Sequence, residues 1–468
     1  MPRACSARAL LLALFFCLPV LPGLTAGAAA AEADAVPRLL KVVALASSGL
    51  HAPVQSGELL DAWTERTWPQ WPAERGKLTR RGAELETEIW SELRKRYLAL
   101  GLLPTHASPA AVYVRADNKQ RTRATATALL GALLPQGSNG YAISPLKPDP
   151  LFHPVENGMC VFNLAATAKD VLRNMPDGLP GLNAEYADQL ALVDRIVGQA
   201  DPELCTRYSL PPNCRLSAIP SSVAITRQGT RALVQGGLGI AASLTHIFLA
   251  EFSQWPSEPA AWGQADTATM RQILSLQSAV FNVVQRTRSV AGAQGSALLN
   301  ALVAALQGQL TDSRGNRSPV LIFVGDDINI ANVAGLLDIH WQASGYPVDA
   351  IPPGGVLAFE LWQEGPQQTV RIKFFAHALE TLHSSTPFED EESLAAFTVR
   401  LGKHGSSTVP VSAFLDRARA AIRKECLSTS KILPQFVDIA SEGPLEETTG
   451  DGLDDDGFGH DEMRPSGE

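Results

Sequence analysis

Short apolar runs alternate with amphipathic stretches along most of this chain. Residues 40–46 are apolar except for Lys41, and similar short runs recur at 111–115 and 320–324. Apolar runs of this length, without a regular polar alternation, are typical of strands that are buried on both faces. Because such strands alternate with helical patterns, the sequence predicts an α/β fold whose parallel sheet is covered on both sides.

Helical periodicity follows the first two of these runs. Apolar residues recur every four positions from Leu85 to Tyr97, and Thr79 stands before them as a candidate N-cap. Gly101 follows the last of them, where helices commonly end. A second helix is predicted to begin at about Thr122.

The pattern changes between residues 156 and 310, where long helix-compatible stretches dominate. These stretches are 186–199, 230–252 and 266–285. The change predicts a helical domain, 156–310, inserted into an α/β domain that is formed by 36–155 and 311–427.

After the insertion the chain returns to strands. A helix is predicted from about Asn329, and two strands at 356–363 and 369–377 are joined at 364–366 by a Glu-Gly-Pro turn. Few apolar residues follow residue 427, so segment 428–468 is predicted to be a disordered acidic tail.

Composition and charge exclude several classes of protein. The 468 residues are 45% hydrophobic and 19% charged, which fits a globular chain of two or three domains. The net charge is -9, but residues 442–468 carry ten acidic residues against one arginine, and the rest of the chain is balanced at 38 of each sign. A neutral body gives no electrostatic reason to bind nucleic acid. The tail is interpreted as a solubilising end, since no apolar anchors interrupt its charges.

Residues 1–31 have the features of a secretory signal peptide. Arg3 and Arg8 precede an apolar core from Leu10 to Leu21, and small residues follow at 29–31. That core is too short to span a bilayer comfortably, so an uncleaved anchor is the less favoured alternative. The mature protein is predicted to be periplasmic or secreted, without stable insertion in a membrane.

Four cysteines remain after the predicted cleavage. They are Cys160, Cys205, Cys214 and Cys426. In an exported protein they predict two disulfides, for which three pairings are possible.

A set of short motifs stands in order between residues 38 and 427. They are Gly49-x-x-Ala52-Pro53, Trp68-Pro69-Gln70-Trp71-Pro72, Leu78-Thr79-x-Arg81-Gly82, Gln120-Arg121-Thr122-Arg123, Asp149-Pro150-Leu151-Phe152, Gln285-Arg286-Thr287, Asn329-x-Ala331-Asn332 and Pro352-Pro353-Gly354-Gly355. In this order they resemble the histidine acid phosphatase family, especially its bacterial periplasmic phytases and glucose-1-phosphatases. The resemblance implies a central mixed sheet flanked by helices, with an inserted helical domain. It also implies the disulfides Cys160–Cys426 and Cys205–Cys214.

The resemblance also assigns chemical roles, and this chain departs from most of them. In the family, a histidine of the first loop attacks phosphorus, arginines bind the phosphate with a second histidine, and an aspartic acid protonates the leaving oxygen. Ser48 stands at the nucleophile position and Asp326 at the second histidine. Ser47 and His51 stand where two arginines are expected.

Four other positions of the family pattern also belong to the expected site. Arg121 matches a later phosphate-binding arginine, and Asp327 matches the proton donor. His246 stands where phytases have a pocket glutamate, and Ile328 is placed on the leaving-group side.

These replacements predict that phosphoryl transfer is lost. Each charge-assisted hydrogen bond to phosphate contributes roughly 1.5–3 kcal/mol, and Asp326 adds a negative charge where the phosphate would lie. The sequence therefore favours a pseudophosphatase without a cofactor or metal, which binds an unknown small molecule or a protein in its cleft. The alternative is an acid phosphomonoesterase or phytase-like hydrolase with weak or altered activity, built on Asp327, Arg121 and the loop of Ser48 and His51.

Three other arrangements of these residues are less favoured by the sequence. Ser48, His51 and Asp327 have the residue types of a hydrolase triad, but small polar fillers of an altered site are the simpler interpretation. Asp326 and Asp327 are adjacent and are not expected to aim both carboxylates at one cation. His246 could pair with Asp326 across the cleft, or be a polar helix residue satisfied elsewhere.

Overall fold

The computed structural model describes residues 36–438, except 176, 227, 257, 259, 384–393, 398, 403–404 and 428–432. The predicted signal peptide, and all of the predicted acidic tail except 433–438, lie outside these residues.

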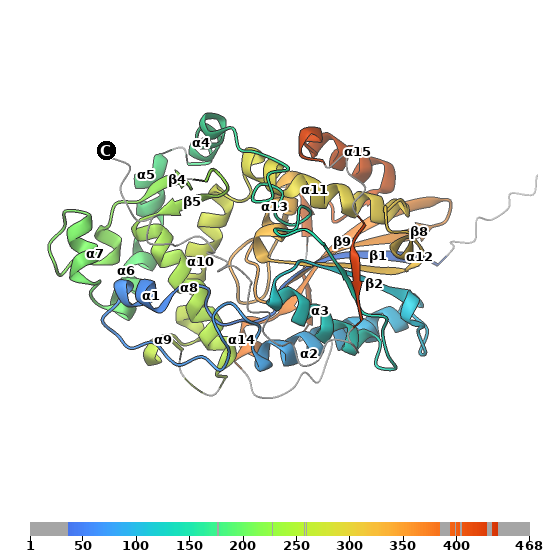
Figure 1. The fold of residues 1–468 in the computed structure, drawn as a ribbon, viewed down its shortest axis with the longest axis horizontal. Coiled ribbons are helices and arrows are strands. Elements are labelled where there is room, and N and C mark those ends of the chain that lie inside the picture. The colour runs from blue at the N-terminus through green and yellow to red at the C-terminus, as the bar shows by residue number, and fades with distance from the viewer. Residues whose placement is uncertain are drawn as a thin grey trace, which may run out of the picture. The chain divides into compact units, whose positions relative to one another are not determined.

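A nine-stranded mixed sheet carries the fold (Figure 1). Its strands are β1 (Arg38–Ser47), β2 (Val112–Ala116), β3 (Tyr141–Ile143), β6 (Val320–Gly325), β8 (Val356–Glu364), β9 (Gln367–His377), β10 (Leu394–Phe397), β12 (Thr408–Pro410) and β13 (Gln435–Val437). The order is β10-β9-β8-β1-β6-β2-β3-β13, and β12 pairs with β9. β1, β6, β2 and β3 are parallel, whereas the other strands pair antiparallel with their neighbours.

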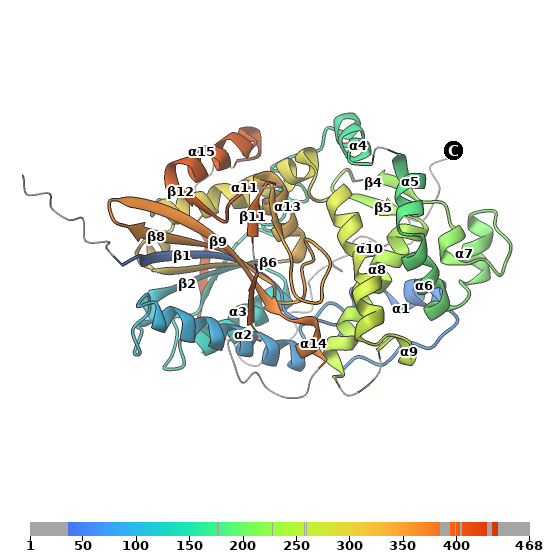
Figure 2. The same ribbon diagram turned by 180° about the vertical axis from the view of Figure 1, so that it is seen from behind.

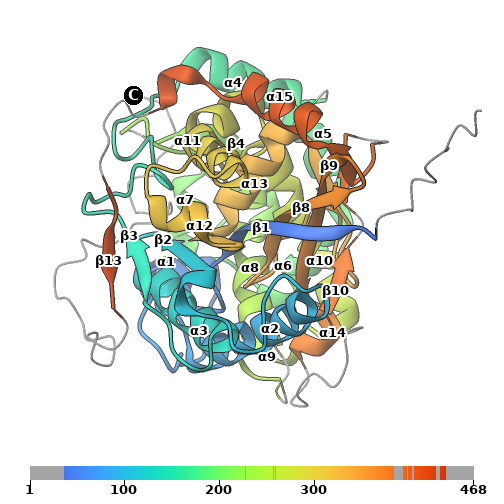
Figure 3. The same cartoon turned by 90° about the vertical axis from the view of Figure 1, so that its right-hand side faces the viewer.

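Helices cover both faces of this sheet, as the sequence predicted. Those that pack on the sheet are α2 (Arg80–Ala99) and α3 (Gln120–Leu133) on one face, and α11 (Arg288–Gln307), α13 (Asp327–Leu337) and α15 (Val411–Ala421) on the other. Figure 3 shows the two helical layers on either side of β1. Successive residues of β1 point to opposite faces, so Val42 joins the core under α2 while Val43 joins the core under α11.

The chain leaves the sheet between β3 and β6 and forms the helical part that the sequence predicted as an insertion (Figure 2). Its elements are α4 (Leu164–Arg173), α5 (Gly178–Glu185), α6 (Ala187–Val197), α7 (Pro202–Arg207), β4 (Ser222–Ile225), β5 (Ala232–Gln235), α8 (Gly237–Gln254), α9 (Ala260–Gly263), α10 (Thr267–Val283), α11 and α12 (Ser313–Arg317). The remaining elements are α1 (Gly57–Trp63), α14 (Leu379–Leu382), the pair β7 (Ile339–Trp341) and β11 (Val399–Leu401), and the short 3-10 turns Pro109–Ala111, Leu216–Ala218 and Lys424–Cys426.

The start of α2 shows how the motifs fix local structure. The Thr79 side chain accepts a hydrogen bond from the Gly82 backbone N–H, which confirms the predicted N-cap. A Cβ at Gly82 would stand 2.1 Å from the Leu50 carbonyl oxygen, so glycine lets the helix pack directly on the loop after β1.

Three sequence predictions need correction. Residues 230–252 are not one helix, because Ala232–Gln235 forms β5 in a hairpin with β4. Gly236, at φ 79°, separates this strand from α8, and a Cβ there would stand 2.0 Å from the Pro220 carbonyl oxygen. The helix placed from about Asn329 begins at Asp327. Finally, 428–468 was predicted to be disordered throughout, yet Gln435–Val437 forms β13 on the exposed edge of β3.

One helix of the described residues, α11, is long and apolar enough to cross a membrane. It packs against α13 and α15, and most of its apolar side chains belong to the core. Such a buried helix is ordinary in the interior of a domain.

Both disulfides implied by the resemblance are formed. Cys160 pairs with Cys426 across 266 residues, and Cys205 pairs with Cys214 across nine. The first joins the beginning of the helical part to the 3-10 turn Lys424–Cys426 that follows α15. The second closes a local loop after α7.

Removal of the two disulfides is expected to have unequal effects. In the chain-entropy model, closing the long Cys160–Cys426 loop stabilises the fold by roughly 4 kcal/mol or more, and closing the short Cys205–Cys214 loop by less than about 3 kcal/mol. The paired alanine variants of each disulfide can be compared by the free energy of unfolding in urea. An equal loss in both would contradict the assignment of the larger constraint to the long loop.

Candidate functional site

A cavity of about 230 Å³ opens at the carboxyl ends of β1 and β6, between the sheet and helices α8, α10 and α11. Ligands of open α/β sheets commonly bind at this edge. Its lining includes every site residue that the sequence singled out, namely Ser47, Ser48, His51, Arg121, His246, Asp326, Asp327 and Ile328. The structure therefore brings these residues together in one cavity.

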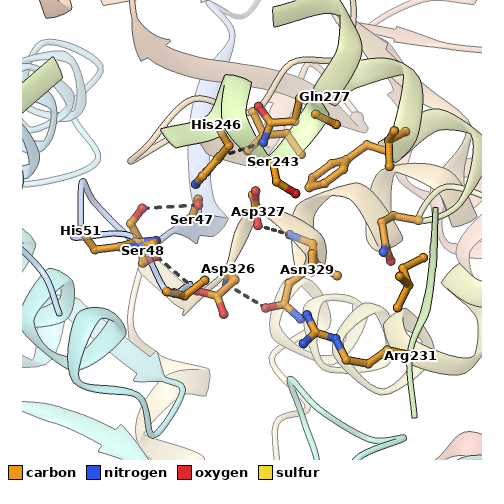
Figure 4. Close-up of a pocket in the computed structure, with 18 of the residues that line it drawn as sticks. Ser47, Ser48, His51, Arg231, Ser243, His246, Gln277, Asp326, Asp327 and Asn329 are labelled. Atoms are coloured by element: carbon orange, nitrogen blue, oxygen red, sulfur yellow. Dashed lines mark hydrogen bonds between the residues drawn. The ribbon is translucent and has the colours of Figure 1, made fainter. Parts of the chain in front are cut away.

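Asp326 lies between Ser48 and Asn329 in the lining of this cavity (Figure 4) and binds charged side chains. Arg121 donates from Nε to Oδ1 at 2.9 Å and from Nη2 to Oδ2 at 2.9 Å, and Lys119 Nζ lies 3.0 Å from Oδ2. Ser48 Oγ donates to Oδ1 at 3.2 Å. We call this arrangement of Arg121, Lys119 and Ser48 around Asp326 the Asp326 clamp.

The topology explains the Asp326 clamp. Asp326 follows β6 directly and is the N-cap of α13, where its backbone N–H donates to Asn329 Oδ1 at 2.8 Å. Lys119 and Arg121 follow β2, which is the neighbour of β6 in the sheet. Burial alone would raise the pKa of Asp326, but Arg121 and Lys119 hold it well below its usual value. The carboxylate is therefore ionised, and both of its oxygens accept hydrogen bonds from Arg121.

The loop after β1 does not form a hydrolase triad. The hydroxyl of Ser48 donates to Asp326 and not to His51, whose Nδ1 lies 2.8 Å from the Ala52 carbonyl oxygen. Burial, with a further contribution from Arg121, lowers the pKa of His51 to about 3. His51 is thus a neutral ring held by its own loop, and the interpretation of polar fillers fits these contacts better.

Asp327 and His246 also line the cavity. Burial raises the pKa of Asp327, with Asp326 adding to the rise and His246 opposing it. Its carboxyl Oδ1 accepts a hydrogen bond from the Ile328 backbone N–H at 2.8 Å. His246 Nδ1 lies 2.9 Å from Gln277 Nε2, so His246 is satisfied within the helices and does not pair with Asp326.

A second buried charge cluster lies beside the clamp and was missed by the sequence analysis. His153 Nε2 is 2.9 Å from Asp117 Oδ2, and its Nδ1 is 3.2 Å from Glu156 Oε2. Burial alone would lower the pKa of His153. The interactions with Asp117 and Glu156 together outweigh burial and raise this pKa to about 10. His153 is therefore an imidazolium between two carboxylates.

This cluster also bears on the question of a metal. Ligand atoms of Asp117, His153 and Asp326 lie within 4.8 Å of one another. A metal needs the lone pair of a neutral imidazole, whereas His153 is protonated, and Lys119 already occupies the Asp326 carboxylate. The arrangement is therefore an internal ion-pair network and does not suit a cation.

Some of the residues that the sequence analysis missed could have been recognised from their position in the sequence, and others could not. Asp117 and Lys119 follow a buried strand and precede a helix, which places them at the functional edge of a parallel sheet. Their position in the sequence could therefore have revealed them. The contact of His153 with Asp117 joins residues 36 apart and depends on the path of the loop after β3, for which no pattern gave a signal.

The Glu86 side chain packs against the loops that contain Gly49 and Gly354 at the site. This buried residue of α2 receives a hydrogen bond from Trp90 Nε1 at 3.1 Å, and a Cβ at Gly354 would stand 2.3 Å from its Oε1. The Gly354 backbone N–H in turn donates to the Ser48 carbonyl oxygen at 3.1 Å. Burial raises the pKa of Glu86 from 4.5 to about 8, so a neutral carboxyl group packs under the loop of Ser48.

Glu86→Gln is expected to stabilise the protein at pH 8 and to have little effect at pH 4. The unfolded state loses the Glu86 proton above about pH 4.5, whereas the folded state keeps it until about pH 8, so this residue makes the wild type less stable as pH rises between these values. The full difference between these two pKa values corresponds to about 5 kcal/mol. Unfolding in urea at both pH values measures it, with the exposed Glu84→Gln as control. Equal effects of Glu86→Gln at the two pH values would contradict the assignment.

Comparisons with known proteins cover most of the chain. A family model described as histidine phosphatase superfamily (branch 2) matches residues 50–375. Phytase AppA of Escherichia coli (strain K12) is 30% identical over 383 residues, which cover 79% of this chain and 88% of the relative. A glucose-1-phosphatase of Providencia rettgeri is 28% identical over 345 residues, covering 71% and 78% of the two chains.

A solved structure extends the similarity to three dimensions. The structure of Hafnia alvei phytase in complex with tartrate superposes with a TM-score of 0.76 at 29% sequence identity. The match covers 84% of this chain and 99% of that one. It therefore includes both the sheet and the helical part that lies between β3 and β6.

Proposed function

The chain belongs to the histidine phosphatase superfamily (branch 2), and from this premise we propose that it is a binding protein that does not form a phosphohistidine. The family and the fold confirm what the motifs implied. The proposal concerns the site, where the family pattern and this chain differ at Ser48 and Asp326.

The observation that supports the proposal most strongly is the Asp326 clamp. Arg121 is the one arginine that this chain keeps from the family's phosphate-binding set, and both of its donating groups are used by Asp326. Lys119 is used in the same way. A phosphate group would have to displace a carboxylate that is attached to the chain, and both anions would then share a buried site.

Ser48 is also poorly placed to act as a nucleophile. A serine hydroxyl needs a base to accept its proton, and its hydrogen-bonding partner here is Asp326. Arg121 and Lys119 hold the pKa of Asp326 well below its usual value despite burial, which makes this carboxylate a weak base. The local chemistry therefore favours binding over covalent catalysis.

One observation favours a second candidate, a hydrolase with weak or altered activity. Burial raises the pKa of Asp327, which favours the protonated form from which a proton could be transferred to a leaving group. Such an enzyme would need water, rather than a side chain, to attack the substrate.

Export is part of the same proposal. The two disulfides are typical of proteins that fold in an oxidising compartment, and the predicted signal peptide would bring the chain to one. We place the ligand-binding function in the periplasm or outside the cell, with a small molecule or a protein segment as the occupant of the cleft.

The purified mature protein is expected not to hydrolyse p-nitrophenyl phosphate, glucose-1-phosphate or phytate at acid pH. Loss of a nucleophile costs on the order of a millionfold in enzymes whose groups act as a unit. Release of inorganic phosphate measures the activity, with Ser48→Ala/Asp327→Ala as the control for contaminating phosphatase. Turnover well above that control would instead establish the hydrolase.

A further inference from the structure

The chemistry of the cleft indicates which ligand it accepts. This inference rests on the proposed function, because it assumes that the cavity serves for binding. The cavity of about 230 Å³ is somewhat smaller than the roughly 300–1,000 Å³ of typical ligand pockets, so its ligand is a small molecule.

One wall of the cavity is apolar. It is lined by Leu233, Val234, Val280, Phe281 and Val284, which come from β5 and from α10 and its end. Side chains of this kind bind an aliphatic or aromatic body by removing its surface from water.

Hydrogen-bond acceptors also line this cavity. Among the described residues, the buried Oε1 atoms of Gln285 and Gln294 receive no hydrogen bond, and both residues line the cavity. Gln285 Nε2 is directed to the Ala232 carbonyl oxygen at 3.4 Å, which leaves its Oε1 on the other side of the amide. A buried acceptor without a donor is unfavourable, so a ligand that donates here gains stability.

These two acceptors and Asp327 line the same cavity. The Gln285 carbonyl oxygen accepts from Asn332 Nδ2 at 2.8 Å, in the helix that Asp327 begins. Gln294 precedes Gly295, where a Cβ would stand 3.0 Å from the Asn332 Cβ. Gln285 and Gln294 therefore flank α13, which starts with the Asp327 carboxyl group.

The cations of the lining are already paired with carboxylates of the chain. Arg121 and Lys119 bind Asp326, and His153 lies between Asp117 and Glu156. The remaining arginine of the lining, Arg231, interacts electrostatically with Glu156. These pairs leave the lining poor in groups that attract an anion and rich in acceptors.

We propose that the cleft binds a small organic amine, whose apolar body lies against the wall of β5 and α10 and whose ammonium group donates to Asp327 and to the acceptors of Gln285 and Gln294. An ammonium group carries three donors and a positive charge, which match two amide oxygens and a carboxylate. This preference is the reverse of that of a phosphate site.

Matched probes test the inference. They are 2-phenylethylamine, hexylamine and cyclohexylmethylamine, each with the alcohol of the same skeleton, together with 3-phenylpropanoate and phenyl phosphate as anions. The amines are expected to raise the melting temperature of the wild-type protein, and at least one should bind about tenfold more tightly than its alcohol by calorimetry, as one charge-assisted hydrogen bond implies. The anions should give no shift.

Two variants separate the contacts from general electrostatics. Asp327→Asn keeps the shape of the side chain and is expected to abolish the preference for amine over alcohol. Glu258→Gln removes one exposed negative charge elsewhere and should preserve the preference. Gln285→Leu should weaken the amines more than the alcohols.

The inference about the ligand can be wrong while the proposed function is right. If no amine binds more tightly than its alcohol, if an anion binds better than every amine, or if Asp327→Asn keeps the amine preference, the inference is wrong. Absence of phosphatase activity would still stand in each case, whereas phosphate release from the esters would overturn the proposed function itself.

Discussion

The combined variant Ser47→Arg, Ser48→His, His51→Arg and Asp326→His is expected to hydrolyse p-nitrophenyl phosphate and to become labelled as a phosphohistidine. It restores the family pattern at four positions, and Asp326→His releases Arg121 from the carboxylate that now occupies it. Asp327 is already in place to protonate the leaving oxygen. Ser47 ends β1, and the other three positions follow β1 or β6 at the same edge of the sheet, where side chains can usually be exchanged without unfolding the domain.

The triple variant that keeps Ser48 is the decisive control for this experiment. It should remain unlabelled and several orders of magnitude less active, because the missing step is covalent and electrostatics cannot replace it. His246 and Ile328 border the leaving-group side, so small aryl phosphates should be better substrates than phytate. A quadruple variant that folds with both disulfides and shows no labelling would place the function of this chain outside the cleft.

Asp326→Ala is expected to destabilise the protein by about 3–5 kcal/mol, because it leaves Arg121 and Lys119 buried without their carboxylate. The pKa of Asp326 is lowered in the folded state, so its contribution is present above the unfolded value of 3.8 and is lost as pH falls below it. The difference from wild type should therefore be full at pH 7 and smaller at pH 2 to 3. Urea unfolding at both pH values measures it.

The double variant Arg121→Met/Asp326→Ala checks the cause of this loss. Removing the buried cation together with its partner should recover part of the stability, because the strongest uncompensated charge is gone. If Arg121→Met destabilised Asp326→Ala as much as it destabilises the wild type, the two side chains would not act as a pair.

The sequence predicted the sheet well because its central strands are buried on both faces. The runs at 40–46, 111–115 and 320–324 are apolar except for Lys41 and Arg115, and their positions agree with β1, β2 and β6 to within two residues. The error at 230–252 has a different origin. Ala232–Gln235 is four residues long and directly precedes an apolar helix, so its apolar side chains extend the helical pattern without a visible boundary.

The site was predictable as a place and not as a set of contacts. The motifs brought Ser48, Arg121 and Asp326 to one cleft, because the carboxyl ends of β1, β2 and β6 meet at one edge. They did not show that Asp326 would be held by Arg121. That contact depends on the side-chain direction of two residues 205 apart, and the role of Lys119 depends on a turn outside the motifs.

The most direct test of the account is a titration of inorganic phosphate into the wild-type protein and into Asp326→Ala, followed by isothermal calorimetry at neutral pH. If the Asp326 carboxylate occupies the place of a phosphate group, the wild type should give no heat of binding at millimolar phosphate. Asp326→Ala should bind phosphate through Arg121 and Lys119, and Arg121→Met/Asp326→Ala should lose this binding. Phosphate binding by the wild type with an affinity equal to that of Asp326→Ala would contradict the central claim.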